Sequence, residues 1–178
     1  MSNKDIKIWI KNYNSLECQF TLKNGGESYD ILEIRKNEVV AFSENNLNFY
    51  DLNKRDKICS IPGFEKPKYN PGQKFCQANE ELLLVCGNKY IFLVDYKEYK
   101  LIGKIKCDGI ITTYKSSNNN IFSGQYNGQI NQWKCNGKEL KLYSYKKKAH
   151  NHGVFSMLIL NNIFISSDKS SLKIWENR

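Results

Sequence analysis

Residues 166–176 have the sequence Ser166-Ser167-Asp168-Lys169-Ser170-Ser171-Leu172-Lys173-Ile174-Trp175-Glu176. The first half of this stretch is rich in serine and contains an aspartate and a lysine, a composition typical of a turn. In the second half the apolar Leu172 and Ile174 alternate with the polar Ser171 and Lys173, and a period of two is typical of a half-buried β-strand. The stretch therefore predicts a turn that leads into a strand of a β-hairpin.

Four weaker copies of this strand occur earlier in the chain, at residues 5–9, 46–51, 90–95 and 128–133. When Trp9, Tyr50, Val94, Trp133 and Trp175 are aligned, successive copies are 41, 44, 39 and 42 residues apart. A repeat of roughly 40 to 45 residues is the period of a propeller blade built from four strands. The sequence therefore predicts an all-β fold, a β-propeller made of four-stranded antiparallel sheets.

Turn signals between the apolar runs set the boundaries of the predicted blades, whose strands are lettered a to d from the centre outward. We expect one domain over residues 1–178, with strands c and d of a partial blade at 5–22, whole blades at 28–61, 74–106 and 109–145, and a partial blade at 150–175. No segment has the 3.6-residue apolar period of a helix. The strands amount to about four blades, the low end of the range for propellers, so we expect the ring to be open or incompletely closed.

The final repeat resembles the WD40 family, and the repeat pattern extends this resemblance over nearly the whole chain. In that family a Gly-His pair precedes strand a, an Asp lies in the turn between strands b and c, and a Trp ends strand c. Here Ala149-His150 lies 25 residues before Trp175. The resemblance implies a hydrogen-bonded structural brace of four side chains, His150, Ser166, Asp168 and Trp175. In the other blades the pattern is eroded, and no comparable residue takes the place of the histidine. In the blade at residues 109–145 the nearest counterpart is Asp108.

The cysteine usage and the absence of apolar segments indicate the compartment. No apolar region follows the first residues, and no run approaches the roughly 18 apolar residues of a membrane helix. The six cysteines occur about once per repeat without a Cys-x-x-Cys pair. We therefore expect reduced structural thiols in an intracellular, cytoplasmic protein, with a disulfide or zinc framework as the alternative.

The net charge of +9 arises from 27 basic and 18 acidic residues. The lysines are scattered among strands and turns, and the only dense run is Lys146-Lys147-Lys148. Scattered lysine is typical of a solvated surface and of protected edge strands. The alternative is a site for nucleic acid or anionic lipid, which a basic surface attracts.

Nothing in the sequence indicates catalysis. The two histidines, His150 and His152, have no neighbouring acid, and no serine is flanked by the glycines of a nucleophile elbow. A zinc site at His-x-His lacks further ligands nearby. We therefore expect no catalytic residues, no metal and no cofactor.

Binding is predicted from the geometry of a propeller, in which the d-to-a and b-to-c turns of all blades emerge on one face. The WD40 resemblance implies a noncatalytic scaffold that binds a peptide or protein there, and the alternative function is a binder of nucleic acid, anionic phosphate or lipid. The candidate partner-binding residues are Glu44, Lys68, Tyr69, Asn88, Asp108, Tyr126, His152 and Lys169. Each of them, taken singly, is also explained as a residue of an ordinary polar turn.

The strand count also predicts a partner for the chain itself. The predicted array begins and ends with a strand c, so closure by one terminal strand leaves a strand edge unpaired. An unpaired edge invites another chain to add to it. We therefore expect self-association, or completion by a missing propeller segment.

Overall fold

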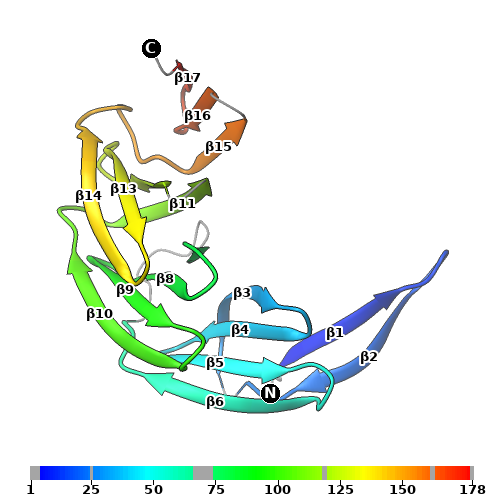
Figure 1. The fold of residues 1–178 in the computed structure, drawn as a ribbon. Helices are drawn as coiled ribbons and strands as arrows, with labels where there is room; N and C mark the ends of the chain where they lie inside the picture. The colour runs from blue at the N-terminus through cyan, green and yellow to red at the C-terminus, as the bar shows by residue number, and fades with distance from the viewer. Residues whose placement is uncertain (1–4, 25, 66–73, 118–119, 161–162, 177–178) are drawn as a thin grey trace. The chain divides into compact units, whose positions relative to one another are not determined.

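A computed structural model describes residues 5–24, 26–65, 74–117, 120–160 and 163–176. Within these ranges the chain forms seventeen strands in five antiparallel sheets and contains no helix (Figure 1). The predicted all-β fold of the propeller type is therefore confirmed. The chain divides into two compact units, Met1–Lys66 and Pro67–Arg178. Two of the candidate residues, Lys68 and Tyr69, lie outside the described ranges.

The first unit contains a two-stranded and a four-stranded sheet, in which consecutive strands pair. Their strands are β1 (Ile6–Lys11) and β2 (Leu16–Leu22), then β3 (Ser28–Arg35), β4 (Glu38–Ser43), β5 (Asn46–Asp51) and β6 (Asp56–Pro62). The two sheets share an apolar core made by Ile6, Leu22, Val39, Ala41 and Tyr50. This core forms because alternate residues of each strand point to the same face.

The second unit contains three sheets, each a meander of consecutive strands. The first has β7 (Phe75–Gln77), β8 (Leu82–Cys86), β9 (Tyr90–Asp95) and β10 (Lys100–Lys106); the second has β11 (Ile111–Ser117), β12 (Asn120–Gln125), β13 (Ile130–Asn136) and β14 (Glu139–Lys146); the third has β15 (Ser156–Leu160), β16 (Ile163–Ser167) and β17 (Leu172–Glu176). Strand β11 contacts both β7 and β15. The first strands of the three sheets therefore lie together, as the inner strands of propeller blades do.

Several strands differ from the predicted boundaries by one to three residues: the first strands of the three sheets in the second unit, for example, are expected at residues 74–78, 109–114 and 154–160. Strand β7 ends at Gln77 because the next residue, Ala78, donates its N–H to the Leu82 carbonyl at 2.8 Å and closes the turn to β8. Strand β15 begins at Ser156, two residues later than expected, because Val154 donates its N–H to the Gln125 carbonyl of the neighbouring sheet at 3.0 Å. In both places a backbone donor serves a turn or an inter-sheet contact instead of the strand ladder.

The sheets of the second unit pack face to face in a regular order. Trp133 and Ile121 lie on the face of sheet β11–β14 that packs against sheet β7–β10. On the opposite face, Phe122 stacks on Phe164 of sheet β15–β17, with ring centroids 4.8 Å apart. Trp175 packs into the same cluster as these two rings. The strand-c tryptophan of each of these two sheets therefore faces the preceding sheet.

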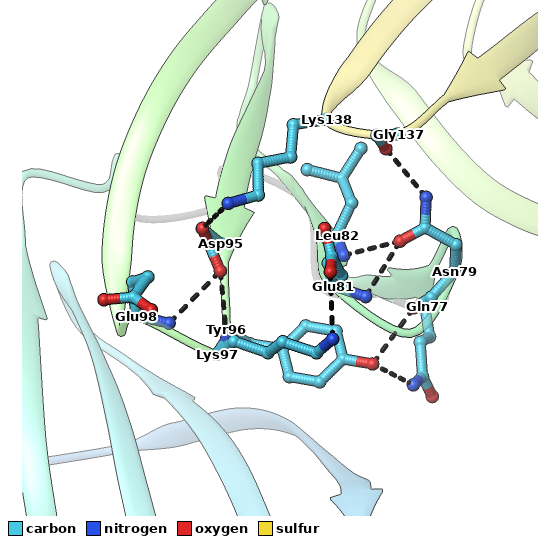
Figure 2. Close-up of polar contacts among 10 residues, drawn as sticks. All are labelled: Gln77, Asn79, Glu81, Leu82, Asp95, Tyr96, Lys97, Glu98, Gly137 and Lys138. Carbon is cyan, nitrogen blue, oxygen red and sulfur yellow. Dashed lines mark hydrogen bonds and ion pairs between the residues drawn. The ribbon is translucent and has the colours of Figure 1, made fainter.

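Polar contacts reinforce the joint between sheets β7–β10 and β11–β14 (Figure 2). The Asn79 side chain donates to the Gly137 carbonyl of the β13–β14 hairpin at 2.7 Å, and Lys138 of that hairpin forms an ion pair with Asp95. Burial acts to raise the pKa of Asp95, but hydrogen bonds from Lys138 and from backbone N–H groups outweigh it and lower the pKa. The ionised carboxylate is therefore the state that these contacts stabilise.

The acidic residue that follows strand c has a local role in two repeats. Asp51 and Asp95 each accept hydrogen bonds of 2.9 to 3.1 Å from the backbone N–H groups two and three residues further on. The fourth residue after each, Arg55 or Tyr99, has a left-handed backbone with φ of 56° and 50°. The aspartate therefore shapes the turn between the third and fourth strands by supplying an acceptor to an otherwise unpaired backbone.

The core thiols should be unreactive in the folded chain. Cys76, Cys86, Cys107 and Cys135 are buried free thiols, whereas Cys18 is exposed. Burial raises the pKa of Cys76 to about 11 and that of Cys86 and Cys107 to about 12, which suppresses the reactive thiolate. With a thiol-specific dye under native conditions, Cys18 should react first and the four core thiols should react only as the protein unfolds. Rapid native labelling of all six cysteines, or fewer than six thiols in denaturant without reductant, would contradict this.

Candidate functional site

Four side chains of the last repeat form one hydrogen-bonded network. His150 Nε2 lies 2.7 Å from the Ser166 hydroxyl, which also accepts a hydrogen bond from Trp175 Nε1 at 2.8 Å. His150 Nδ1 lies 3.2 Å from the Ser171 hydroxyl and 3.7 Å from Asp168 Oδ2. The structure thus brings His150, Ser166, Asp168 and Trp175 together, and adds Ser171, which the sequence analysis did not include.

The hydrogen bonds fix the tautomer of His150. Ser166 accepts from Trp175, so its own proton is free to be donated to His150 Nε2. The proton on Nδ1 then points to Ser171, whose hydroxyl donates in turn to Asp168 Oδ1 at 2.9 Å. In this arrangement each donor meets an acceptor, and a fully satisfied buried network specifies a single geometry.

The charges of the network follow from its surroundings. Burial lowers the pKa of His150; the Asp168 carboxylate acts in the opposite sense, and Lys173 adds to the lowering. Burial acts to raise the pKa of Asp168, but hydrogen bonds from the backbone N–H groups and hydroxyls of Ser170 and Ser171 outweigh it and hold the pKa well below its usual range. The network therefore contains a neutral imidazole and an ionised carboxylate at neutral pH.

Sheet β11–β14 contains only part of this arrangement. Trp133 Nε1 donates to the Ser123 hydroxyl at 2.8 Å, as Trp175 does to Ser166. Asp108, expected as the counterpart of the histidine, is exposed. The residue after Asp108 is Gly109, and the fully buried side chain of Gln125 lies against it. A Cβ added to Gly109 would be 2.4 Å from the Oε1 atom of Gln125. Asp108 therefore does not take the place of His150 in this sheet, as the eroded pattern of this repeat indicates.

The first unit contains a different polar network, which the sequence analysis missed. The buried Asn48 amide donates to Asn24 Oδ1 at 3.0 Å and to the Ser43 hydroxyl at 2.7 Å. Tyr50, the aligned aromatic residue, donates its hydroxyl to Asn24 Oδ1 at 2.8 Å, and burial raises its pKa to about 12. Asn24 lies 26 residues before Tyr50, close to the 25 between His150 and Trp175, and this spacing was the available signal.

The candidate binding residues of the second unit lie on one edge, which we call the turn rim. It comprises the turns between second and third strands, at 87–89, 126–129 and 168–171, and the loops between sheets, at 107–110 and 147–155. Backbone hydrogen bonds tie turns to loops along this edge: Cys107 N to Lys89 O (2.8 Å), Tyr126 N to Ile110 O (2.8 Å), His150 N to Gly128 O (3.0 Å) and Val154 N to Gln125 O (3.0 Å). The rim is therefore a rigid edge of backbone.

The side chains of the turn rim are mixed in charge and partly aromatic. Asp108 and Lys169 are exposed, Asn88 and His152 are half-buried, and Tyr126 is 49% exposed. The remaining described candidate, Glu44, is exposed in the β4–β5 turn of the first unit, where its φ is 49°. The structure thus brings five of the candidates to one edge of the second unit.

Two further classes of site are absent from the described residues. No group of three or more His, Cys, Asp or Glu side chains in these ranges could hold a metal ion. Within the same part of the chain, no helix is long and apolar enough to cross a membrane.

No protein-family model matches the sequence, and no curated protein matches it. Two solved structures are similar in fold. The computationally designed Ika4 protein is 15% identical, with a TM-score of 0.70 over 86% of this chain and 92% of that chain. A chain in the crystal structure of the mitotic checkpoint complex is 14% identical, with a TM-score of 0.71 over 90% of this chain. This chain spans about half of that one, 52%. At these identities the likeness shows the fold alone.

Gly128 should be indispensable to the contact between the turn rim and the brace. Its φ is +79°, and a Cβ there would lie 2.0 Å from the His150 carbonyl oxygen. Replacing Gly128 by Ala should lower the unfolding midpoint well beyond the effect of Gly137→Ala. Gly137 is the matched control because its φ is +56° with open space around it, so it carries only the backbone cost of about 1–2 kcal/mol. Equal losses in the two variants, measured in urea, would contradict the collision at Gly128.

Replacing His150 by Ala should destabilise the chain at pH 7 by about 1–3 kcal/mol, because the buried Ser166 hydroxyl loses a partner. The pKa of His150 is lowered from its ordinary value of 6.5, so the unfolded chain takes up the proton first and the histidine's contribution is lost as pH falls below 6.5. The stability difference between wild type and variant should therefore narrow from pH 7 to pH 5. Asp168, with a lowered pKa, loses its contribution only as pH falls below its ordinary 3.8. A difference that widens on acidification would show that the folded chain binds the proton more tightly.

Proposed function

We propose that this chain is a noncatalytic scaffold of the WD40 type that binds a peptide or protein partner on the turn rim of its second unit. The observation that carries this proposal is the set of hydrogen bonds that tie the turns of the rim to the adjacent loops, through backbone carbonyls at Lys89 and Gly128 and through the Asp168 carboxylate, which accepts from His152 N–H at 3.2 Å. A rim whose backbone is already fixed avoids the cost of ordering its loops on binding, and such preorganisation increases affinity. Rigid loops on a β-scaffold commonly carry recognition.

The exposed chemistry of the rim suits a protein partner. The ring of Tyr126 is half-exposed. The main chain of Tyr126 is held by a hydrogen bond to the Ile110 carbonyl and packs closely against Gly153. Tyrosine is enriched among the residues that dominate the energy of protein interfaces. Asp108 and Lys169 add opposite charges on either side of it along the rim, a combination that selects a partner by complementary charge.

The absence of catalysis is part of the proposal. His150 is buried, and both of its ring nitrogens are engaged by serine hydroxyls. Asp168 is held ionised by four hydrogen bonds from Ser170 and Ser171. His150 and Asp168 are therefore used for structure, whereas a general base needs an accessible nitrogen or oxygen.

Three observations support the WD40 and intracellular parts of the proposal. The blade-length repeat and the His150–Ser166–Trp175 contacts match the pattern that the sequence resembles. The fold is similar to that of a chain in the mitotic checkpoint complex. All six cysteines are free thiols, which favours a reducing compartment.

A second candidate function is favoured by strand β14 and the turn after it. Lys134 and Lys147 lie over the rings of Tyr143 and Tyr145, at 3.8 and 5.7 Å from the ring centroids, and both rings are more than half exposed. Exposed tyrosines with lysines close by can hold a single-stranded nucleic acid by stacking and charge. Salt separates the two functions, because binding to phosphates weakens steeply with ionic strength.

Peptides selected from a random display library on the immobilised chain should bind through the rim. Tyr126→Ala should weaken binding of the selected peptides about tenfold or more, the loss typical of an interface anchor. Glu98→Ala is the control: Glu98 is exposed in the β9–β10 turn, at the opposite end of the strands, and this change should leave the affinity unchanged. Both variants should keep the wild-type unfolding midpoint. Equal affinity of wild type and Tyr126→Ala for the selected peptides would overturn the proposed site. If no peptide is selected, and oligonucleotides bind at low salt but not at moderate salt, the result would favour nucleic-acid binding at β14.

A further inference from the structure

Sheet β15–β17 has one face that carries a group of aliphatic side chains, with Ser156 and Ser167 in the row at one end. Register pairs Leu158 with Ile165 and Ile165 with Ile174 across the three strands, and Leu160 with Ile163 in the next row. With Leu172 these residues make six aliphatic side chains on one side of a small sheet, which we call the aliphatic face. Five of the six are between 42% and 65% exposed. Such a contiguous apolar surface usually marks an interaction site.

The opposite face of this sheet is the one used within the chain. Met157 and Trp175 belong to the cluster that packs against sheet β11–β14, and Phe164 stacks on Phe122 there. Because strand residues alternate between faces, the aliphatic face points away from this contact. It is therefore a second packing surface of the sheet.

The equivalent face of sheet β11–β14 shows what kind of partner such a face takes. Ser123 and Ser166 occupy equivalent positions in the two sheets, because each accepts a hydrogen bond from the tryptophan of the third strand. The residue before each serine is therefore also equivalent, so Phe122 corresponds to Ile165. The row through Phe122 is Lys115, Phe122 and Gln132, and this face is covered by the tryptophan-bearing face of the next sheet. The aliphatic face has leucine and isoleucine where this covered face has lysine and glutamine. The more apolar of two equivalent surfaces is thus the exposed one.

The chain carries another face of the complementary kind. Strand β1 buries Ile6 against the four-stranded sheet of the first unit, so Lys7, Trp9 and Lys11 lie on its other side. Trp9 is the strand-c aromatic of its repeat and is 52% exposed, and Leu16, paired with Lys11, is 66% exposed. This surface, which we call the Trp9 face, corresponds to the side that Trp133 and Trp175 turn toward the preceding sheet.

We propose that the aliphatic face of one copy of the chain binds the Trp9 face of a second copy. The contact repeats between molecules the packing that joins sheets β11–β14 and β15–β17 within one molecule. It uses two different surfaces, so the association is head to tail, and it closes when the second copy makes the same contact in return. The turn rim takes no part, so this proposal is independent of the peptide site.

The test measures mass by sedimentation velocity on the full chain over a wide concentration range. Wild type should shift from the 20.8 kDa monomer toward the mass of two copies as concentration rises. Ile174→Lys should remain monomeric, because it removes an apolar side chain from the contact and places a positive charge opposite Lys7 and Lys11 of the Trp9 face. Ile102→Lys is the matched control, since Ile102 is a similarly exposed isoleucine on β10 and should leave the association intact. Circular dichroism and the unfolding midpoint of each variant show that it is folded.

A mixing experiment identifies the partner surface. Trp9→Lys should also be monomeric alone, but it keeps an intact aliphatic face, whereas Ile174→Lys keeps an intact Trp9 face. Mixing the two variants should therefore restore a complex of one copy of each. A mixture that stays monomeric, or one variant that still self-associates, would overturn the head-to-tail contact. A wild-type chain that is monomeric at every concentration would overturn the proposal altogether, and would leave the aliphatic face to the other unit of the same chain or to a different protein.

Discussion

A β-sheet that is apolar on both sides must find a neighbour for each face, and this requirement organises the second unit. Strand β8 is buried along its whole length, and β9 nearly so, so residues on both faces of this sheet are excluded from water. Each tryptophan at the end of a third strand fills the layer toward the preceding sheet. The contacts at Asn79, Lys138 and Gly128 are polar additions at the ends of these layers, where strands give way to turns.

The amino-acid sequence predicts the strand architecture well because the signal for it is distributed over many residues. Five aromatic or apolar residues at blade-length intervals and several turn signals all support the same assignment, so one weak repeat does little harm. The boundaries at Ala78 and Val154 were displaced because single backbone hydrogen bonds decided them. Such bonds depend on which atoms lie nearby in space, and local sequence carries no record of that.

The polar networks were predicted less evenly, for a physical reason. His150 is recognisable because imidazole can bridge two hydroxyls and its place in the repeat is fixed. Asn24 does a related task with an amide, but asparagine is common in the turns of this chain, so the residue type alone carried little information. Asp108 has the spacing of His150 but its side chain is exposed, and the space beside it is filled by Gln125.

The position of sheet β11–β14 between two others has a consequence for how the second unit comes apart. A stack in which each layer touches only its neighbours behaves as a one-dimensional array, whose cooperativity comes from the interfaces between layers. The middle layer has two such interfaces and sheet β15–β17 has one within the unit. Opening that outer sheet breaks a single interface together with the brace at His150, whereas opening the middle sheet breaks both of its interfaces. Loss of structure should therefore begin at sheet β15–β17 and spread to the middle sheet. The hydrogen bonds of the brace then contribute to the free energy of this first local opening.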